Sequence, residues 1–325
     1  MIKGKSNIKD RINEFAKRKE PFLFVIDFDG TSGFVEPLDD CAEQDVLFKI
    51  KHLKNYELPA TQNSSFTFAK FPIAAKYYKT GFDLVQKGIA DGNTYLINLT
   101  YPTKIETNLS LQEIFYRSEA KYKLFFKNKF VVFSPETFVR IQNQKIYSYP
   151  MKGTIDATIP DAYNKLKNSF KEIAEHHTIV DLIRNDLNRV SKGVGLEKFR
   201  TIENIKTHDA ELLTVSSRIA GQLREGFEDR IGDLLYDMLP AGSVTGAPKK
   251  KTVEIIKNAE QYDRGFYTGV FGIFDGYNLQ SSVMIRFIEN NEGELFFKSG
   301  GGITTFSDWE AEYQELIDKV YLPIR

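Results

Sequence analysis

Short apolar runs and polar turns alternate closely in the middle of the chain. Between Tyr122 and Tyr149, four apolar runs are separated by short turns that contain Asn, Lys, Ser-Pro and Asn-Gln. Parallel strands need long crossovers, so this spacing predicts antiparallel hairpins and meanders. A second set of the same kind extends from Phe266 to Gly302. Its middle segment, Leu279 to Glu289, is predicted as one strand.

Other segments carry apolar residues at helical spacing. The most polar of these, Phe170–Val190, places Ile173, Ile179 and Ile183 on an apolar stripe and predicts a helix that passes into a tight polar turn. Helices are predicted at 8–19, 82–90, 161–183, 227–238, 249–260 and 309–321. We therefore expect an α+β fold, in which two large antiparallel β-sheets pack as a sandwich with helices on the outside.

Composition narrows the class of protein. The length of 325 residues allows two domains or one large layered domain, and the absence of repeats and linkers predicts a single domain over 1–325. Forty-four basic residues balance forty-four acidic ones, so no overall charge attracts nucleic acid or a membrane surface. Cys41 is the only cysteine, and no segment is as apolar as a signal peptide or spanning helix. We expect a cytoplasmic protein with neither nucleic acid nor a membrane as its partner.

Two acidic positions are candidates for chemistry. Glu175 has no cation three or four residues after it in its predicted helix, so it is a candidate to hold a metal or a substrate charge. A solvated helix face would give the same pattern. Glu136 opens one predicted strand, and Lys152 follows the next strand sixteen residues later. A hairpin would bring them together as acid and nucleophile, whereas the alternative is an exposed lysine and an unrelated glutamate.

A glycine-containing loop and an arginine add to the candidates. Gly242 and Gly246 free a loop that presents the hydroxyls of Ser243 and Thr245. The predicted helix that starts just after this loop offers backbone amides to an anion. The spacing of the glycines excludes a nucleotide-binding P-loop. Arg286 lies inside the predicted apolar strand, where a guanidinium needs an anionic partner.

The last part of the chain contains a glycine run and an acidic helix. Gly300–Gly302 would let the backbone approach a bound group, although a bulge or tight turn explains the run equally well. Glu312 and Glu315 share one face of a predicted helix, and Lys319 follows four residues later, as in a surface salt bridge. Together with Glu175, the two glutamates would instead complete an oxygen-only site for Mg²⁺.

Taken together, several segments resemble the chorismate-utilising enzymes. This family contains anthranilate synthase component I, aminodeoxychorismate synthase component I, isochorismate synthase and salicylate synthase. The resemblance covers most of the chain from about Gly81 onward and implies a two-sheet core with one buried site for chorismate. The segments that carry it are SPETFV, AEHHTIVDLIRNDLNRV, LPAGSVTGAPKKKTVEII, RGFYTGVFGIFDG, SSVMIRFIE and SGGGITTFSDWEAEYQELIDKV.

The resemblance also implies roles for individual residues. Mg²⁺ would bridge the ring carboxylate of chorismate to glutamates Glu175 and Glu315, with Glu312 close by. The substrate-binding positions that it implies are Thr245, Tyr267, Arg286 and Lys319, and the backbone of Gly301 and Gly302.

Three positions indicate which reaction of the family is implied. Lys152 matches the lysine of the aminodeoxychorismate synthases, which attacks C2 of chorismate as the C4 hydroxyl departs, before ammonia adds at C4. Glu136 matches the general acid that protonates this hydroxyl. Leu96 falls where the water-adding members carry a basic lysine, and leucine cannot activate water. Because an attacking amine must be neutral, we expect desolvation to lower the pKa of Lys152.

The resemblance thus implies aminodeoxychorismate synthase component I, which acts in 4-aminobenzoate and folate synthesis. The alternatives are anthranilate synthase component I, which releases pyruvate, and a non-catalytic relative that binds chorismate or a partner. Nothing in the sequence resembles a glutaminase, so ammonia is expected from a separate glutamine amidotransferase subunit. The region 1–80 is shorter than in the family, so tryptophan feedback is not expected. The family histidine is replaced near Glu211 to Thr214.

Overall fold

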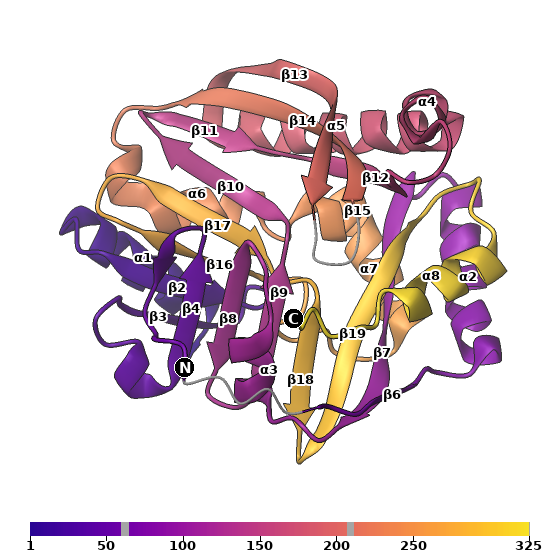
Figure 1. Ribbon diagram of the computed structural model, residues 1–325. Coiled ribbons are helices and arrows are strands. Elements are labelled where there is room, and N and C mark those ends of the chain that lie inside the picture. The colour runs from indigo at the N-terminus through magenta and orange to yellow at the C-terminus, as the bar shows by residue number, and fades with distance from the viewer. Residues whose placement is uncertain (60–64, 207–210, 325) are drawn as a thin grey trace.

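The structure is a computed structural model that describes residues 1–59, 65–206 and 211–324. Within these ranges, only the backbone is described at 152, 154, 170, 171, 203–206, 211 and 212. Two antiparallel sheets pack against each other, and helices lie on their outer sides (Figure 1). The predicted α+β sandwich is confirmed.

The first sheet has ten strands among the described residues. Its strands are β1 (Ile2–Lys3), β2 (Phe22–Ile26), β3 (Ser32–Pro37), β10 (Thr137–Gln142), β11 (Lys145–Ser148), β12 (Met151–Asp156), β13 (Ser191–Lys206), β14 (Glu211–Leu223), β16 (Val270–Phe274) and β17 (Leu279–Val283). They follow the order β1-β3-β2-β16-β17-β10-β11-β14-β12, and β13 pairs with β14. Every described pair is antiparallel, as the short turns predict.

The second sheet has nine strands in the same described ranges. Its strands are β4 (Val46–Ile50), β5 (Leu53–Lys54), β6 (Phe68–Phe71), β7 (Leu96–Thr107), β8 (Tyr122–Phe126), β9 (Phe130–Ser134), β15 (Gly246–Ala247), β18 (Phe287–Asn291) and β19 (Glu294–Ile303). Their order is β15-β7-β19-β18-β9-β8-β4-β5, and β6 pairs with β7.

Helices cover the outer faces of both sheets. They are α1 (Lys5–Lys17), α2 (Ala75–Ala90), α3 (Leu111–Arg117), α4 (Ala162–Asn168), α5 (Phe170–Val190), α6 (Ile231–Met238), α7 (Lys249–Glu260) and α8 (Trp309–Asp318), with single 3₁₀ turns at Ala42–Gln44, Phe227–Arg230 and Gly242–Val244. In the described ranges, none of the helices is both long and apolar enough to cross a membrane.

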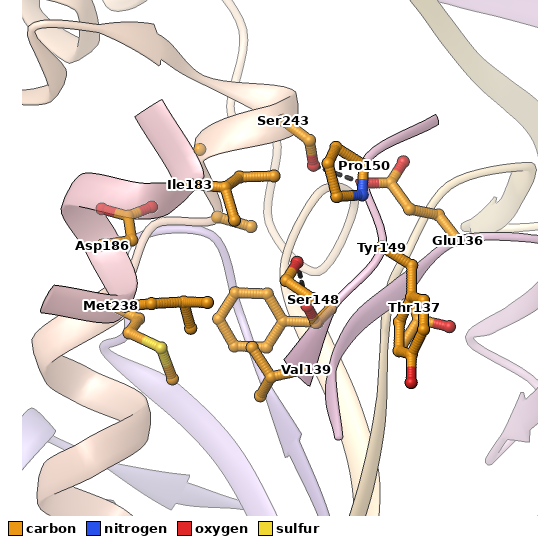
Figure 2. A pocket seen from close by; sticks show the side chains of 14 residues that line it. Glu136, Thr137, Val139, Ser148, Tyr149, Pro150, Ile183, Asp186, Met238 and Ser243 are labelled. Carbon is orange, nitrogen blue, oxygen red and sulfur yellow. Dashed lines mark hydrogen bonds between the residues drawn. The ribbon is translucent and has the colours of Figure 1, made fainter. Parts of the chain in front are cut away.

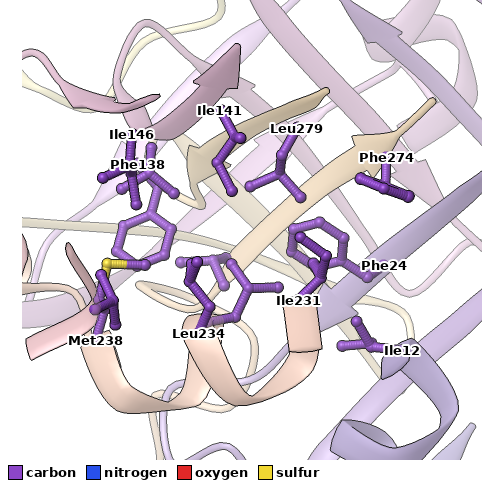
Figure 3. Close-up of a cluster of buried hydrophobic side chains, with 14 of the residues drawn as sticks. Ile12, Phe24, Phe138, Ile141, Ile146, Ile231, Leu234, Met238, Phe274 and Leu279 are labelled. Carbon is purple, nitrogen blue, oxygen red and sulfur yellow. The ribbon is translucent and has the colours of Figure 1, made fainter. Parts of the chain in front are cut away.

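Strand β2 of the first sheet is covered by helices on one face and by the second sheet on the other. Its sequence FLFVI is buried at every position, and alternate side chains of a strand point to opposite faces. Phe22 and Phe24 pack in a cluster with helices α1 and α6, part of which is drawn in Figure 3. Leu23 and Val25 pack instead against β8 and β9 of the second sheet. Because both faces are covered, the strand has a continuous apolar sequence rather than an alternating one.

The predicted strand from Leu279 to Glu289 is wrong, because this segment forms two strands. Its first half is β17 in the first sheet, and its second half is β18 in the second sheet. Met284 to Arg286 connect them, and Arg286 has a left-handed backbone with a φ of 53°. Both halves are apolar, so the sequence pattern conceals the turn. Arg286 therefore lies at the crossing between the sheets and not inside a strand.

The predicted helix 161–183 is also divided. Helix α4 ends before Ser169, whose extended backbone caps the start of α5, and its hydroxyl accepts the amide of Glu172 at 3.4 Å. A serine in this position supplies a partner for an amide that the first helical turn leaves free. From there α5 continues to Val190, so the polar stretch expected as a turn is helical.

A buried ion pair joins α7 to the second sheet. The guanidinium of Arg264 lies 2.6 Å from the carboxylate of Glu260, and the two side chains are 2% and 1% exposed. The carboxylate also accepts the amide of Thr100 at 2.8 Å, and Arg264 donates to the carbonyls of Asn98 at 2.6 Å and Val244 at 2.8 Å. The pair therefore holds β7 and the 242–246 loop to the end of α7.

Glu260→Ala should destabilise the fold by about 3–5 kcal/mol, because it leaves the buried Arg264 guanidinium without its charge partner. The free energy of unfolding from urea denaturation measures this loss. Glu254→Ala on the same helix is the control, because Glu254 pairs with Lys251 on the surface. Such exposed pairs contribute little, so the control should unfold close to the wild-type midpoint. Equal losses in the two variants would contradict the prediction.

Candidate active site

Glu312 and Glu315 converge on the glycine run of β19. A side chain added at Gly301 would place its Cβ 3.1 Å from Oε2 of Glu312 and 3.5 Å from Oε1 of Glu315. Glu312 is buried in the first turn of α8, where the hydroxyl of Ser307 donates to its Oε1 at 2.7 Å. A glycine at this position leaves room for both carboxylates close to the strand.

Lys319 links the acidic helix back to the same strand. Its ammonium lies 2.6 Å from Oε1 of Glu315 and donates to the carbonyl of Gly300 at 2.8 Å. The salt bridge expected from the spacing is therefore present, and it also fixes the end of α8 over β19. Gly302, which is half-buried, pairs with Asn98 of β7 and continues the strand.

Glu175 borders a cavity of about 240 Å³. The cavity is also lined by Thr178 from the next turn of α5 and by 304–306, which follow the glycine strand β19. The aromatic rings of Tyr95 and Phe306 are largely exposed at its edge. Glu175 thus faces the segment that connects β19 to the acidic helix α8.

The chemistry of these carboxylates fits Mg²⁺. This ion takes one or two protein carboxylates and completes its shell with water and substrate oxygens. Glu312 and Glu315 offer such a pair over Gly301. Over the described residues, no three acidic, histidine or cysteine side chains gather closely enough to enclose a metal by themselves. A site that shares its ion with a bound carboxylate needs no third protein ligand.

Glu136 is held firmly on the other side of the site. It connects β9 to β10, and its carbonyl accepts the hydroxyl of Ser282 at 2.7 Å while its amide donates to Ser134 at 3.1 Å. Its carboxylate Oε1 accepts a hydrogen bond from the hydroxyl of Ser243 (Figure 2). Ser243 and Glu136 are 107 residues apart, so sequence spacing gave no sign of this contact.

Strands β10 and β11 form a hairpin between Glu136 and Lys152, as the sequence predicts. In β10 and β11, Arg140 faces Tyr147. Beyond this pair, Glu136 and Pro150 line the same small cavity. Strand β12 then follows the same edge of β14 as β11 does. The Lys152 side chain itself lies outside the described residues. Beside it, Gly153 has a φ of 82° and its carbonyl accepts the hydroxyl of Thr214 at 3.2 Å.

The loop that carries Ser243 is clamped at both ends. Lys249 lies 2.7 Å from Asp186 of α5 and donates to the carbonyl of Met238 at 2.6 Å. Burial raises the pKa of Asp186 and lowers that of Lys249, and the charge of each partner offsets part of the other's shift. Thr245 is fully buried, and its hydroxyl donates to the carbonyl of Ala241 at 2.8 Å. The positive side chain in the first turn of α7, Lys249, is thus already paired with an acidic residue of the protein.

Tyr267 and Arg286 lie between the sheets near Glu136. Tyr267 is buried, and this burial raises the pKa of its phenol well above the usual value. The positive charge of Arg286 and the negative charge of Glu136 both act on this phenol. Arg286 is half-buried, its guanidinium lies 5.8 Å from the ring of Tyr321, and it forms no ion pair with any described residue. Its charge therefore remains available to an anionic group.

Two further positions from the sequence analysis are Leu96 and the segment where the family histidine is expected. Leu96 is buried against Ile179 and Leu182 of α5, so no base stands at that wall. The histidine nearest to this segment, His208, lies outside the described residues, as does the side chain of Glu211.

The sequence did not predict a buried hydrogen bond next to Glu175. His176 is fully buried, and its Nε2 lies 2.6 Å from the hydroxyl of Ser217 on β14. The amide of Ser217 in turn donates to the carbonyl of Pro150 at 3.0 Å, two residues before Lys152. This contact ties α5 to the strands that carry the candidate nucleophile. The only sequence signal was the position of His176 next to Glu175.

Comparisons with known proteins agree with this architecture. Residues 31–325 match the family model of the chorismate binding enzymes. An uncharacterized PabA-like protein of Pasteurella multocida is 51% identical over 316 residues, which cover 96% of this chain and 97% of that protein. Aminodeoxychorismate synthase component 1 of Bacillus subtilis is 30% identical over 298 residues, which cover 85% of this chain and 62% of that protein.

A solved structure extends the likeness to the fold. Anthranilate synthase component I of Streptococcus pneumoniae superimposes with a TM-score of 0.66 at 25% identity, over 79% of this chain and 59% of that one. The chain thus spans less than two thirds of the length of the two synthases. The family match over 31–325 and the half-identical relative together show that the chain belongs to the family of chorismate-binding enzymes.

Proposed function

We propose that the chain is an aminodeoxychorismate synthase component I, which aminates chorismate at C4 to give 4-amino-4-deoxychorismate. The observation that carries this proposal is the setting of Glu136. Its carboxyl is held by Ser243, and it lines one small cavity together with Pro150, two residues before Lys152. An acid and an amine nucleophile at one site are what this reaction needs.

The proposed reaction has two displacement steps. The neutral amine of Lys152 forms a bond to C2, the two ring double bonds shift, and the C4–O bond breaks as Glu136 protonates the departing hydroxyl. Water leaves, and ammonia then adds at C4 while the bond between Lys152 and C2 breaks. The carboxylate of Glu136 is now in the state that accepts the extra proton of the added ammonia.

Binding groups for the substrate would come from both sheets. Arg286 would pair with a carboxylate of chorismate, supported by the buried phenol of Tyr267. Thr245 and the backbone of Gly301 and Gly302 would line the ring, as the resemblance implies. Lys319 would add positive charge beside the glycine strand.

Glu312 and Glu315 over Gly301 would hold Mg²⁺, which would neutralise the ring carboxylate of the substrate. Glu175, the third glutamate that the resemblance implies, would reach the ion through the substrate or a water molecule, because no three such side chains gather in the described residues. The ammonia would come from a separate glutamine amidotransferase subunit.

Two observations separate this proposal from the other reactions of the family. The apolar wall formed by Leu96, Ile179 and Leu182 offers no base to activate water, which disfavours an isochorismate synthase. Lys152 disfavours an anthranilate synthase, although a synthase of that kind shares the fold at 25% identity. A role limited to binding would not require an acid, a nucleophile and convergent carboxylates in one chain.

Product analysis tests the reaction directly. Purified protein with chorismate, Mg²⁺ and ammonium at mildly alkaline pH should form 4-amino-4-deoxychorismate, identified by mass-resolved chromatography. Added aminodeoxychorismate lyase should convert it to 4-aminobenzoate. Reactions without ammonium, or with EDTA in place of Mg²⁺, are the controls and should leave chorismate unchanged. Anthranilate and pyruvate as the products would show that the chain is an anthranilate synthase instead.

Lys152→Ala should abolish amination while Mg²⁺ and chorismate binding remain close to wild type, because it removes only the attacking amine. Initial rates of product formation, together with binding titrations of chorismate, measure the two effects separately. Lys145→Ala is the matched control, because Lys145 is exposed on the neighbouring strand β11. Amination at the wild-type rate in Lys152→Ala would refute the covalent route.

A further inference from the structure

We propose that Ser243 is a positioning residue, which orients the carboxyl of Glu136 for proton transfer. This inference rests on the proposed role of Glu136 as the proton donor. Ser243 is not among the residues singled out for substrate binding. Its hydroxyl donates to Oε1 of Glu136 (Figure 2).

The backbone of Glu136 is already fixed before Ser243 acts. Its carbonyl accepts both the hydroxyl of Ser282 at 2.7 Å and the amide of Val283 at 3.3 Å, and its amide donates to the hydroxyl of Ser134 at 3.1 Å. The side-chain torsions of Glu136 remain to be set. Because hydrogen bonds are directional, the bond from Ser243 restricts them.

Ser243 itself is carried by a rigid loop. A Cβ on the preceding Gly242 would lie 3.0 Å from both Asp186 Oδ2 and the Leu182 side chain, so the loop packs directly on α5. The Asp186–Lys249 pair at 2.7 Å and the bond of Arg264 to the carbonyl of Val244 at 2.8 Å hold its two sides. The hydroxyl is therefore presented from a fixed frame.

A hydroxyl suits both protonation states of the acid. Serine can donate to a carboxylate, and it can accept from the O–H of a protonated carboxyl. The contact can therefore persist when Glu136 gives up its proton, and the side chain need not reorient between the two states. A neighbouring methyl group or lysine could not do this.

A small cavity beside this contact supports the same assignment. It has a volume of about 20 Å³ and is lined by Glu136, Ser243, Ser148 and Asp186 (Figure 2). A space of this size holds about one water molecule, and both Glu136 and Ser243 are half-buried beside it. Ser148 lies in the same lining, but its hydroxyl donates to the carbonyl of Phe138 at 3.2 Å and not to Glu136.

The test combines kinetics with a double-mutant cycle. Ser243→Ala should lower kcat by about 10-fold to 100-fold with little change in KM for chorismate, because the acid stays present but loses its orientation. In the Glu136→Gln background, the same substitution should cost little more, because Ser243 acts through Glu136. Ser243→Thr keeps the hydroxyl and should recover most of kcat.

The pH profile gives a readout that a purely structural role would not move. A hydrogen bond donated to a carboxylate favours the ionised form. Without it, Glu136 should keep its proton to higher pH, so the alkaline limb of kcat should move upward in Ser243→Ala. Among the described residues, the charged and ionisable groups near Glu136 include Tyr267 with Arg286 beside it and, across the cavity, Asp186 with its partner Lys249. Ser148→Ala is the matched control and should leave this limb in place.

A measurement without turnover separates this inference from the proposed function. Carbon-13 NMR of the labelled glutamate side chains, with the Glu136 signal assigned from Glu136→Gln, should show its titration midpoint rise in Ser243→Ala. That shift supports the inference whatever the product of the reaction is. An unmoved midpoint, a loss of kcat that adds fully to that of Glu136→Gln, or an effect confined to KM would each overturn it.

Discussion

The buried pair of Arg264 and Glu260 sets the position of everything that surrounds the site. The guanidinium contacts the second sheet at Asn98, the 242–246 loop at Val244, and the ring of Phe28 just after β2 at 4.7 Å. Charges buried this deeply are tolerated only when every proton and lone pair has a partner. The pair therefore defines one arrangement of two sheets and a loop, and other arrangements would leave a charge unsatisfied.

The candidate site divides its chemistry between the two sheets. On the side of the first sheet are the acid Glu136, the strand of Lys152 and the helix of Glu175. On the side of the second sheet are the glycine strand with Glu312 and Glu315 over it. Under the proposed function, the acid and the nucleophile would thus come from the first sheet, whereas the candidate metal ligands would come from both sides. A ring bound between them would meet both sets at once, which is consistent with the proposed amination.

Sequence patterns predicted the layers of the fold but not the places where the chain changes layer. Close turns can only join antiparallel neighbours, so the two sheets followed from spacing alone. The step at Met284 to Arg286 was hidden, because strands buried on both faces are apolar on either side of it. The break at Ser169 could have been found from the serine followed three residues later by Glu172, which is a known helix-start pattern.

The candidate site was predictable where its residues are local in sequence. Glu312, Glu315 and Lys319 share one helix, so their spacing indicated their contacts. Contacts between residues far apart in the sequence gave no such signal. The structure alone revealed two of them, the hydrogen bonds of Ser243 with Glu136 and of His176 with Ser217. Periodicity describes the face on which a side chain lies, but the partner on that face depends on how distant elements pack.

The packing of Leu96 bears on how this family diverges. Its side chain touches Ile179 and Leu182, which belong to the same helix that presents Glu175. An ammonium placed there would enter an aliphatic wall, and its burial without a partner would favour the neutral, unprotonated form or displace the helix. Replacing Leu96 by a lysine would therefore also require changes in the residues that pack against it. A protein in which only this residue had changed would be poorly packed at this position.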